Sequence, residues 1–156
     1  MDGDVFVREV KLLSPTLFRI SMSILRHEQD AQDALQQALE KAWTKRECVH
    51  EGTFKPWLTS ILVNECRDML RRKKRILVTD TFAEKPVPAH DMSLRDALDR
   101  LAEKYRTPFL LKYMENFSEK EIAAMLRLPG STIRGRLYRA KQQLQVELNE
   151  KEAERV

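Results

Sequence analysis

Glycine and cysteine are scarce in this chain of 156 residues, which contains 4 glycines and 2 cysteines. So few glycines argue against the glycine-rich loops that cradle phosphate groups, and two cysteines do not suggest a disulfide framework. No apolar run approaches the length of about 20 residues that spans a bilayer. The N-terminus lacks the basic region and apolar core of a signal peptide. We therefore expect a cytoplasmic protein that does not insert into membranes.

Side chains arranged for catalysis or metal binding are equally sparse. No Ser/His/Asp pattern or pair of catalytic carboxylates stands out. Cys48 and His50 could share a metal ion, but no second pair of ligands follows at a suitable spacing. We therefore expect no enzymatic activity, no cofactor and no metal site.

The charges are nearly balanced but unevenly placed. Lys plus Arg number 28 against 24 for Asp plus Glu, so the formal net charge is +4. Acidic residues gather at 28–40 and after Glu147, whereas basic residues gather at 71–75 and 127–141. Two separate basic surfaces indicate a polyanionic partner such as nucleic acid.

Residues 118–141 read as a helix-turn-helix with a basic second helix. Ser118 and Glu121 form a capping box that begins the first helix. Pro129 and Gly130 break it, and Ser131 or Thr132 can cap the second. The second helix has an apolar stripe made of Ile133, Leu137, Ala140 and Leu144.

No acidic residue occurs from Ile122 to Val146, so the other face of the second helix is basic. Such a helix suits the DNA major groove. The alternative is an ordinary helical hairpin with a solvated basic face. The candidate base contacts are Ser131, Thr132, Arg134 and Arg136, and the candidate phosphate contacts are Arg139 and Lys141.

The periodicity predicts an all-α fold with two small helical domains, at residues 4–75 and 93–148, joined by a flexible linker at 76–92. In the first domain we expect four helices: 4–13, one restarting at Ser14-Pro15, one capped by Asp30 with Trp43 in its core face, and one over 54–75. Pro86 and Pro88 favour an extended linker. In the second domain a helix capped by Ser93 and another near 107–116 precede the helix-turn-helix.

The helix at 54–75 ends in five consecutive cations, Arg71 to Arg75. Cations are favoured at a helix C-terminus by the dipole alone, but five repel one another unless a polyanion is nearby. Asn64 and Arg67 lie on the same broad side, with Trp57 a few turns back. This chemistry suits exposed bases and a phosphate backbone. By contrast, the polar face of residues 30–41 reads on its chemistry as a solvated helix surface.

The order of these parts resembles the extracytoplasmic-function group of the sigma-70 family, the small bacterial RNA polymerase initiation factors. Residues 30–43, DAQDALQQALEKAW, are similar to the family's D-A-E-D-A-x-Q-E-x-F-x-x-A-W. Residues 54–72, FKPWLTSILVNECRDMLRR, resemble F-R-x-W-L-x-x-I-A-x-N-x-x-x-D-x-L-R-R. Residues 126–141, LRLPGSTIRGRLYRAK, resemble L-G-I-P-x-G-T-V-K-S-R-L-x-R-A-R.

The resemblance implies a transcription initiation factor that binds core RNA polymerase, through the β′ clamp helices and the β flap, and promoter DNA. It reverses the reading of the polar face at 30–41, whose side chains become polymerase contacts: Asp30, Asp33, Gln36, Gln37 and Glu40. It assigns the minus-ten element to Trp57, Asn64, Arg67, Arg71, Arg72 and Lys73. It assigns the minus-thirty-five element to Ser131, Thr132, Arg134, Arg136, Arg139 and Lys141. An anti-sigma partner and a role in stress response are further implications, and we expect a monomer when free.

Three positions depart from the family's pattern: Cys48 stands where an aromatic residue is frequent, Arg127 where glycine is common and Gly135 where serine is common. Two alternatives remain. A stand-alone dimeric helix-turn-helix regulator would explain residues 118–141 but not Trp57, Asn64 and the run at 71–75. A sigma-like mimic that binds an anti-sigma protein would be expected to have depleted basic faces, which this chain does not have.

Overall fold

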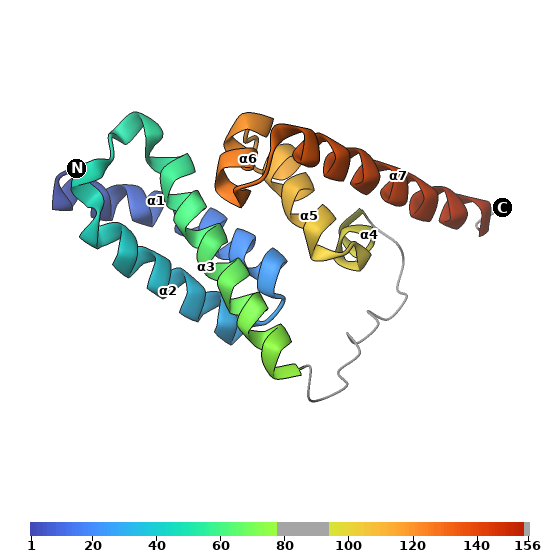
Figure 1. Cartoon of the computed structure of the whole chain (residues 1–156), viewed down its shortest axis with the longest axis horizontal. Helices are drawn as coiled ribbons and strands as arrows, with labels where there is room; N and C mark the ends of the chain where they lie inside the picture. Colours follow the sequence, from blue (N-terminus) through green and yellow to red (C-terminus); the bar gives the residue numbers. More distant parts are fainter. Residues whose placement is uncertain (78–93, 155–156) are drawn as a thin grey trace.

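The structure, a computed structural model, describes residues 1–77 and 94–154. The described residues are almost entirely helical and contain no strand, which confirms the all-α prediction. The elements are α1 (Gly3–Leu25), α2 (Glu28–Thr44), η1 (Arg46–Cys48), η2 (Glu51–Thr53), α3 (Phe54–Leu77), α4 (Leu94–Arg100), α5 (Glu103–Phe109), η3 (Leu110–Met114), α6 (Glu119–Leu126) and α7 (Gly130–Glu154) (Figure 1). The expected linker at 76–92 and the Ser93 cap lie almost wholly outside the described residues.

The first expected break is absent, because α1 runs through Pro15 as one helix. Its buried residues recur at helical spacing on both sides of the proline, from Phe6 through Leu17 to Ile24. Pro15 is itself exposed, and the hydroxyl of Ser14 donates a 2.8 Å hydrogen bond to the Val10 carbonyl. The prediction of two helices was wrong because burial of a continuous stripe outweighs one lost backbone hydrogen bond.

The next helix, α2, packs closely against α1 and α3. Four alanines on its inner face are fully buried: Ala31, Ala34, Ala38 and Ala42. Its N-cap is His27, whose Nδ1 accepts from the Asp30 amide, and not Asp30 as expected. Trp43 was expected in the core but is 42% exposed, with its ring edge-on to Phe6.

The long helix α3 begins at Phe54, so Pro56 falls in its first turn as expected. Its inner side is fully or nearly fully buried against α1 and α2, with Phe54, Leu58, Leu62 and Cys66 in the core. Together α1, α2 and α3 form the N-terminal half of the described structure (Figure 1).

The C-terminal half is built around α7, which packs against α4, α5 and α6. The helix expected near 107–116 begins earlier, at Glu103, and passes into the π-helical turn η3 before it ends at Met114. The capping box of Ser118 and Glu121 is present at the start of α6. The helix α7 begins at Gly130, so Ser131 and Thr132 lie inside its first turn and do not cap it as expected.

The two halves are packed against each other, with α3 touching α6 and α1 touching α5. Two arginines cross this boundary. Arg19 of α1 forms a forked ion pair with Glu115, with nitrogen–oxygen distances of 2.9 and 3.2 Å. Buried Arg106 of α5 donates to the Ser23 carbonyl at 2.8 Å and to the Leu101 carbonyl at 2.6 Å.

Candidate nucleic-acid interface

The helix α7 buries the predicted apolar stripe and leaves its other side open. Ile133, Leu137, Ala140 and Leu144 are all buried against the C-terminal half. Ser131, Arg134, Arg139 and Lys141 are exposed, whereas Thr132 and Arg136 are half-buried. The structure therefore brings the predicted contacts together on one helix, and four of the six are open to a partner.

Two of these cations, Arg136 and Lys141, lie partly against other groups of the chain. One guanidinium nitrogen of Arg136, Nη1, is buried, and no hydrogen-bond partner is found for it among the described residues. The ammonium of Lys141 lies 4.8 Å from the centre of the Tyr113 ring, a cation–π distance.

One carboxylate lies within reach of this basic helix. Lys112 donates a 2.5 Å hydrogen bond to Glu119, which lowers the pKa of Glu119. The charges of Arg134 and Lys141 lower the pKa of Glu119 further. The same hydrogen bond raises the pKa of Lys112. Glu119, at the N-terminus of α6, therefore stays ionised at neutral pH.

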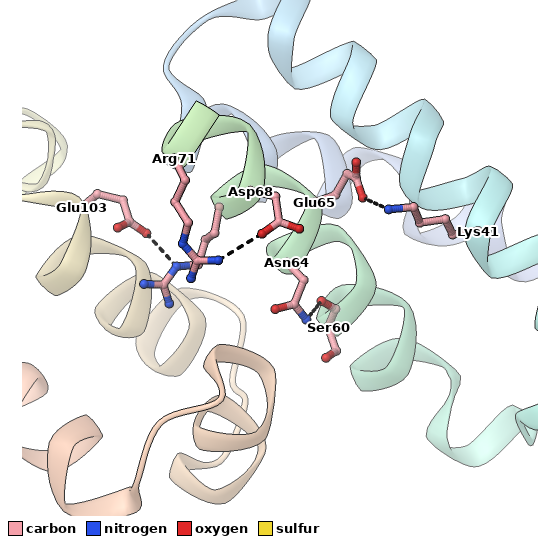
Figure 2. Close-up of polar contacts among 8 residues, drawn as sticks. Lys41, Ser60, Asn64, Glu65, Asp68, Arg71 and Glu103 are labelled. Carbon is pink, nitrogen blue, oxygen red and sulfur yellow. Dashed lines mark hydrogen bonds and ion pairs between the residues drawn. The ribbon is translucent and has the colours of Figure 1, made fainter. Parts of the chain in front are cut away.

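On α3, the predicted contacts to exposed bases lie on one side of the helix. Asn64, Asp68 and Arg71 follow one another at helical spacing, as Figure 2 shows. The amide nitrogen of Asn64 donates to the Ser60 carbonyl one turn back at 2.7 Å, which fixes its rotamer. Arg71 pairs with Asp68 at 3.0 Å, and both side chains are more than half exposed. Trp57, two turns before Asn64, is half-buried with its ring tilted against Phe54.

The predicted phosphate contacts divide into open and paired cations. Arg72 is exposed. Arg67 is only 17% exposed, and its Nε lies 3.9 Å from a carboxylate oxygen of Glu103 of α5. Lys73 forms an ion pair with Asp30, which was itself predicted to contact polymerase. Three of the predicted cations, Arg67, Arg71 and Lys73, therefore have partners within the chain, and the Arg71 pair is the one that is more than half exposed.

Arg67 belongs to a line of α3 that faces the C-terminal half. Three turns earlier, the ammonium of Lys55 lies 5.4 Å from the centre of the Phe117 ring. The positions between them at the same four-residue spacing are fully buried: Thr59 and Val63. This line explains why Arg67 points away from the open face that carries Asn64 and Arg71.

The polar side chains of α2 face solvent and form hydrogen bonds with one another along the helix. Gln29 donates to Asp33 at 3.0 Å, and Gln36 donates to Glu40 at 3.5 Å. Beside it, Lys41 binds the buried carboxylate of Glu65 at 2.5 Å and joins α2 to α3 (Figure 2). An open groove of about 770 Å³ runs along this junction. It is lined by Gln37, Glu40, Lys41, Glu65, Asp68, Arg71, Arg72 and Arg75.

Among the described residues, three exposed aromatic side chains were not among the predicted site residues: Trp43, Tyr113 and Tyr138. Trp43 borders a shallow apolar groove of about 470 Å³ with Phe6, Leu35 and Leu39. Tyr138 lies on α7 and is 64% exposed. A signal for Tyr138 was present in the sequence, because an aromatic residue off the apolar stripe of a basic helix has no core to enter.

Among the described residues, no cluster of three or more His, Cys, Asp or Glu side chains could hold a metal ion. Within the same ranges, the helices are too polar or too short to cross a bilayer.

Comparison with known proteins matches both halves to described protein families. Residues 10–76 match Sigma-70 region 2, and residues 91–144 match Sigma-70 region 4. The chain is 32% identical to RNA polymerase sigma factor SigV of Bacillus subtilis, with 86% of each chain covered. It is 28% identical to the RNA polymerase sigma-E factor of Streptomyces coelicolor, with 92% of this chain and 85% of the relative covered.

A solved structure is similar across both halves. It is the sigma factor RpoE of Bartonella quintana in complex with the anti-sigma factor NepR, with a TM-score of 0.75 and 28% identity. The match covers 92% of this chain and 96% of that one. The similarity therefore includes the packing of one half on the other as well as the fold of each.

Proposed function

The chain belongs to the extracytoplasmic-function group of the sigma-70 family, and from this premise we propose how its surfaces divide the work of starting transcription. The N-terminal half binds core RNA polymerase and the minus-ten element, and the C-terminal half binds the minus-thirty-five element. No covalent chemistry belongs to this chain, because the polymerase carries it.

The polar face of α2 is the polymerase contact. Asp33, Gln36, Gln37 and Glu40 are open or half-open to solvent, and their hydrogen bonds are local and exchangeable. The buried alanines on the opposite face and the Lys41–Glu65 bond hold α2 in place, so a partner meets a rigid helix. Asp30 contributes mainly through its pairing with Lys73.

The open side of α3 captures the melted minus-ten strand. The amide of Asn64 retains a carbonyl oxygen and a second N–H for the edge of an unstacked base. Trp57 offers ring surface near the same side, and Arg71 and Arg72 hold phosphates. Arg67 and Lys73 join them once their pairs with Glu103 and Asp30 are exchanged for phosphate.

The exposed side of α7 reads the minus-thirty-five element in the major groove. Arg134 and Ser131 lie near its N-terminus, where recognition helices meet base edges. Arg139 is placed a turn further on for a phosphate. Thr132 and Arg136 are half-buried, so we assign them smaller shares.

The contact between the two halves carries the mechanism, because a packed chain is too short to reach both elements at once. The helix α3 touches α6, which directly precedes α7. By the positions in their names, the minus-ten and minus-thirty-five elements lie about 25 base pairs apart, or roughly 85 Å at about 3.4 Å per pair. The halves must therefore separate on the promoter, and polymerase holds them at the distance that lets two weak contacts act as one strong contact.

A protein that binds the packed form would keep the factor inactive. RpoE of Bartonella quintana was solved in complex with an anti-sigma factor, and its chain is similar to this one across both halves. We assign an anti-sigma partner to this chain on that similarity. Such a partner shifts the equilibrium towards the packed form only by the difference in its affinity for the two forms.

Run-off transcription with purified core polymerase tests the proposed function. We expect promoter-dependent transcripts from fragments of the source genome only when the protein is added. If no fragment gives such a transcript, the sigma function is refuted.

The role of Asn64 is tested on duplex and pre-melted templates. Asn64→Ala should reduce open complexes about tenfold where the minus-ten element matches, because capture of one base contributes about 1–3 kcal/mol. Promoters without a match should be unaffected. The matched control is Asn149→Ala, which changes an exposed asparagine far along α7. Equal losses with and without a minus-ten match would refute base capture.

The role of Arg134 is tested by discrimination between sequences. If Arg134 reads a base, Arg134→Ala should lose about 1–3 kcal/mol of discrimination at one position of the upstream element. A loss that is uniform across sequences would identify Arg134 as a phosphate contact.

A further inference from the structure

The side of α7 opposite its buried stripe is a strip without charge of its own. At about 100° per residue, the positions farthest from Ile133, Leu137 and Ala140 come at steps of three and four residues. They are all exposed: Ser131, Gly135, Tyr138 and Gln142. Arg134 and Arg139 flank this strip, so the strip is the part of α7 that a bound duplex would meet first.

Gly135 has no structural reason to be glycine. It lies inside a helix, and no glycine among the described residues has a positive φ. A Cβ built at Gly135 would meet nothing within 4 Å, so close packing within the chain does not require its absence. Glycine is the least helix-favouring residue after proline. What remains is a close approach by something outside the chain.

Tyr138 is one turn further along the same strip and is held in place. It is 64% exposed, yet its hydroxyl accepts a 3.0 Å hydrogen bond from the side-chain amide of Gln142. The ring and the amide therefore form one ordered unit on a surface that is otherwise basic. In the major groove, apolar groups contact the thymine methyl, and a glutamine amide pairs with adenine.

We propose that Gly135 lets α7 enter the major groove deeply and that the Tyr138–Gln142 pair reads an A·T step there. This inference rests on the assignment of α7 to the minus-thirty-five element, and it adds specificity-determining residues to it. The missing side chain brings the helix backbone towards the bases. The ring then lies against a thymine methyl, while Arg134 reaches a neighbouring base edge and Arg139 holds a phosphate. A side chain at position 135 would lift the helix and move the pair away from the bases.

The first test separates DNA binding from stability. Gly135→Ala should raise Tm by a few degrees, because alanine favours the helix and its methyl meets open space. The same variant should bind the minus-thirty-five element, in complex with core polymerase, about tenfold more weakly. Asn149→Ala is the control, since it improves helix propensity at an exposed position about 21 Å further along the axis. Unchanged affinity in Gly135→Ala would overturn the close approach.

The second test locates the thymine. The probe is the upstream element that the wild-type holoenzyme selects from random duplexes, with each thymine replaced in turn by uracil, which lacks the methyl group. One or two replacements should weaken wild-type binding by several fold and have no effect on Tyr138→Ala. Tyr138→Phe should stay sensitive, because the ring remains.

The outcomes of these tests are distinct. If wild-type holoenzyme selects no upstream element, the proposed function fails. If it selects one and Tyr138→Ala keeps the full wild-type response to every uracil, only the present inference is overturned. A loss in Tyr138→Ala that is equal for all sequences would likewise overturn base reading by the ring.

Discussion

The ion pair between Arg19 and Glu115 offers a direct way to loosen the packing of the two halves. Four atoms of the pair meet in a fork, with Arg19 Nε and Nη2 at 2.9 and 3.2 Å from the two carboxylate oxygens. The side chain of Glu115 is 6% exposed, whereas that of Arg19 is 58% exposed. Arg19→Ala leaves the carboxylate buried without its cation, and separation of the halves returns it to water.

The magnitude follows from the geometry. A hydrogen bond to a charged group contributes about 1.5–3 kcal/mol. Because solvent screens the half-exposed Arg19, we take the lower end, about 1.5 kcal/mol. A change of about 1.4 kcal/mol is tenfold in an equilibrium. Arg19→Ala should therefore lower the ratio of packed to separated chains by about tenfold, and Glu115→Gln should lower it less because the amide keeps a hydrogen bond.

The assay is energy transfer between dyes on the exposed native Cys48 and on a cysteine placed at exposed Gln143, without polymerase. The control is Lys41→Ala. Its ion pair with Glu65 has the same exposures, 58% and 6%, but joins α2 to α3 within one half. The population with low transfer should grow in Arg19→Ala and not in the control. If Arg19→Ala and Glu115→Gln fold and keep the wild-type distribution of energy transfer, the Arg19–Glu115 pair does not hold the halves together.

Three further predictions concern stability and thiol chemistry. Arg127 ends α6 with φ of 55°, a left-handed conformation that strains any residue with a side chain. Arg127→Gly should therefore raise the free energy of unfolding by about 0.5–1 kcal/mol, seen as a higher urea midpoint at an unchanged slope. A lower urea midpoint would show that Arg127 is not strained. At pH 8 the native protein should present one fast thiol to a disulfide reagent, exposed Cys48, because burial first and Glu65 second raise the pKa of Cys66 to about 12; two fast equivalents would refute this. Folding raises the pKa of the Cys66 thiol from its ordinary value of 9.0 to about 12. The free energy of unfolding should therefore not depend on this thiol below pH 9, and it should fall by about 1.4 kcal/mol per pH unit from pH 9 towards pH 12. Cys66→Ala should reduce that slope in alkaline denaturation curves.

Local features of this fold could be predicted from the sequence because neighbours along the chain determine them. The capping box at Ser118 and the apolar stripe of α7 need only residues three or four apart, and both predictions were confirmed. The role of each exposed side chain in binding stays a prediction. Its position on a helix follows from periodicity, whereas its partner does not.

Contacts between distant segments were beyond sequence reasoning. Arg19 and Glu115 are 96 residues apart, and nothing local marks them as partners. For the same reason the sequence could not show that Arg67 faces Glu103 while Arg71 stays open. Trp43 was placed in the core because it continues the inner face of α2, but which faces are covered depends on where the neighbouring helices end.

Arg106 has a consequence for how the free chain unfolds. Its buried guanidinium bonds to the Ser23 carbonyl in one half and to the Leu101 carbonyl in the other, so neither half can melt in place without stranding part of this charge. The free chain should therefore show a single calorimetric transition, in which the van't Hoff and calorimetric enthalpies agree. In the proposed open form on polymerase, the chain would lose the Ser23 bond and keep the Leu101 bond. Each half should then unfold as its own cooperative unit.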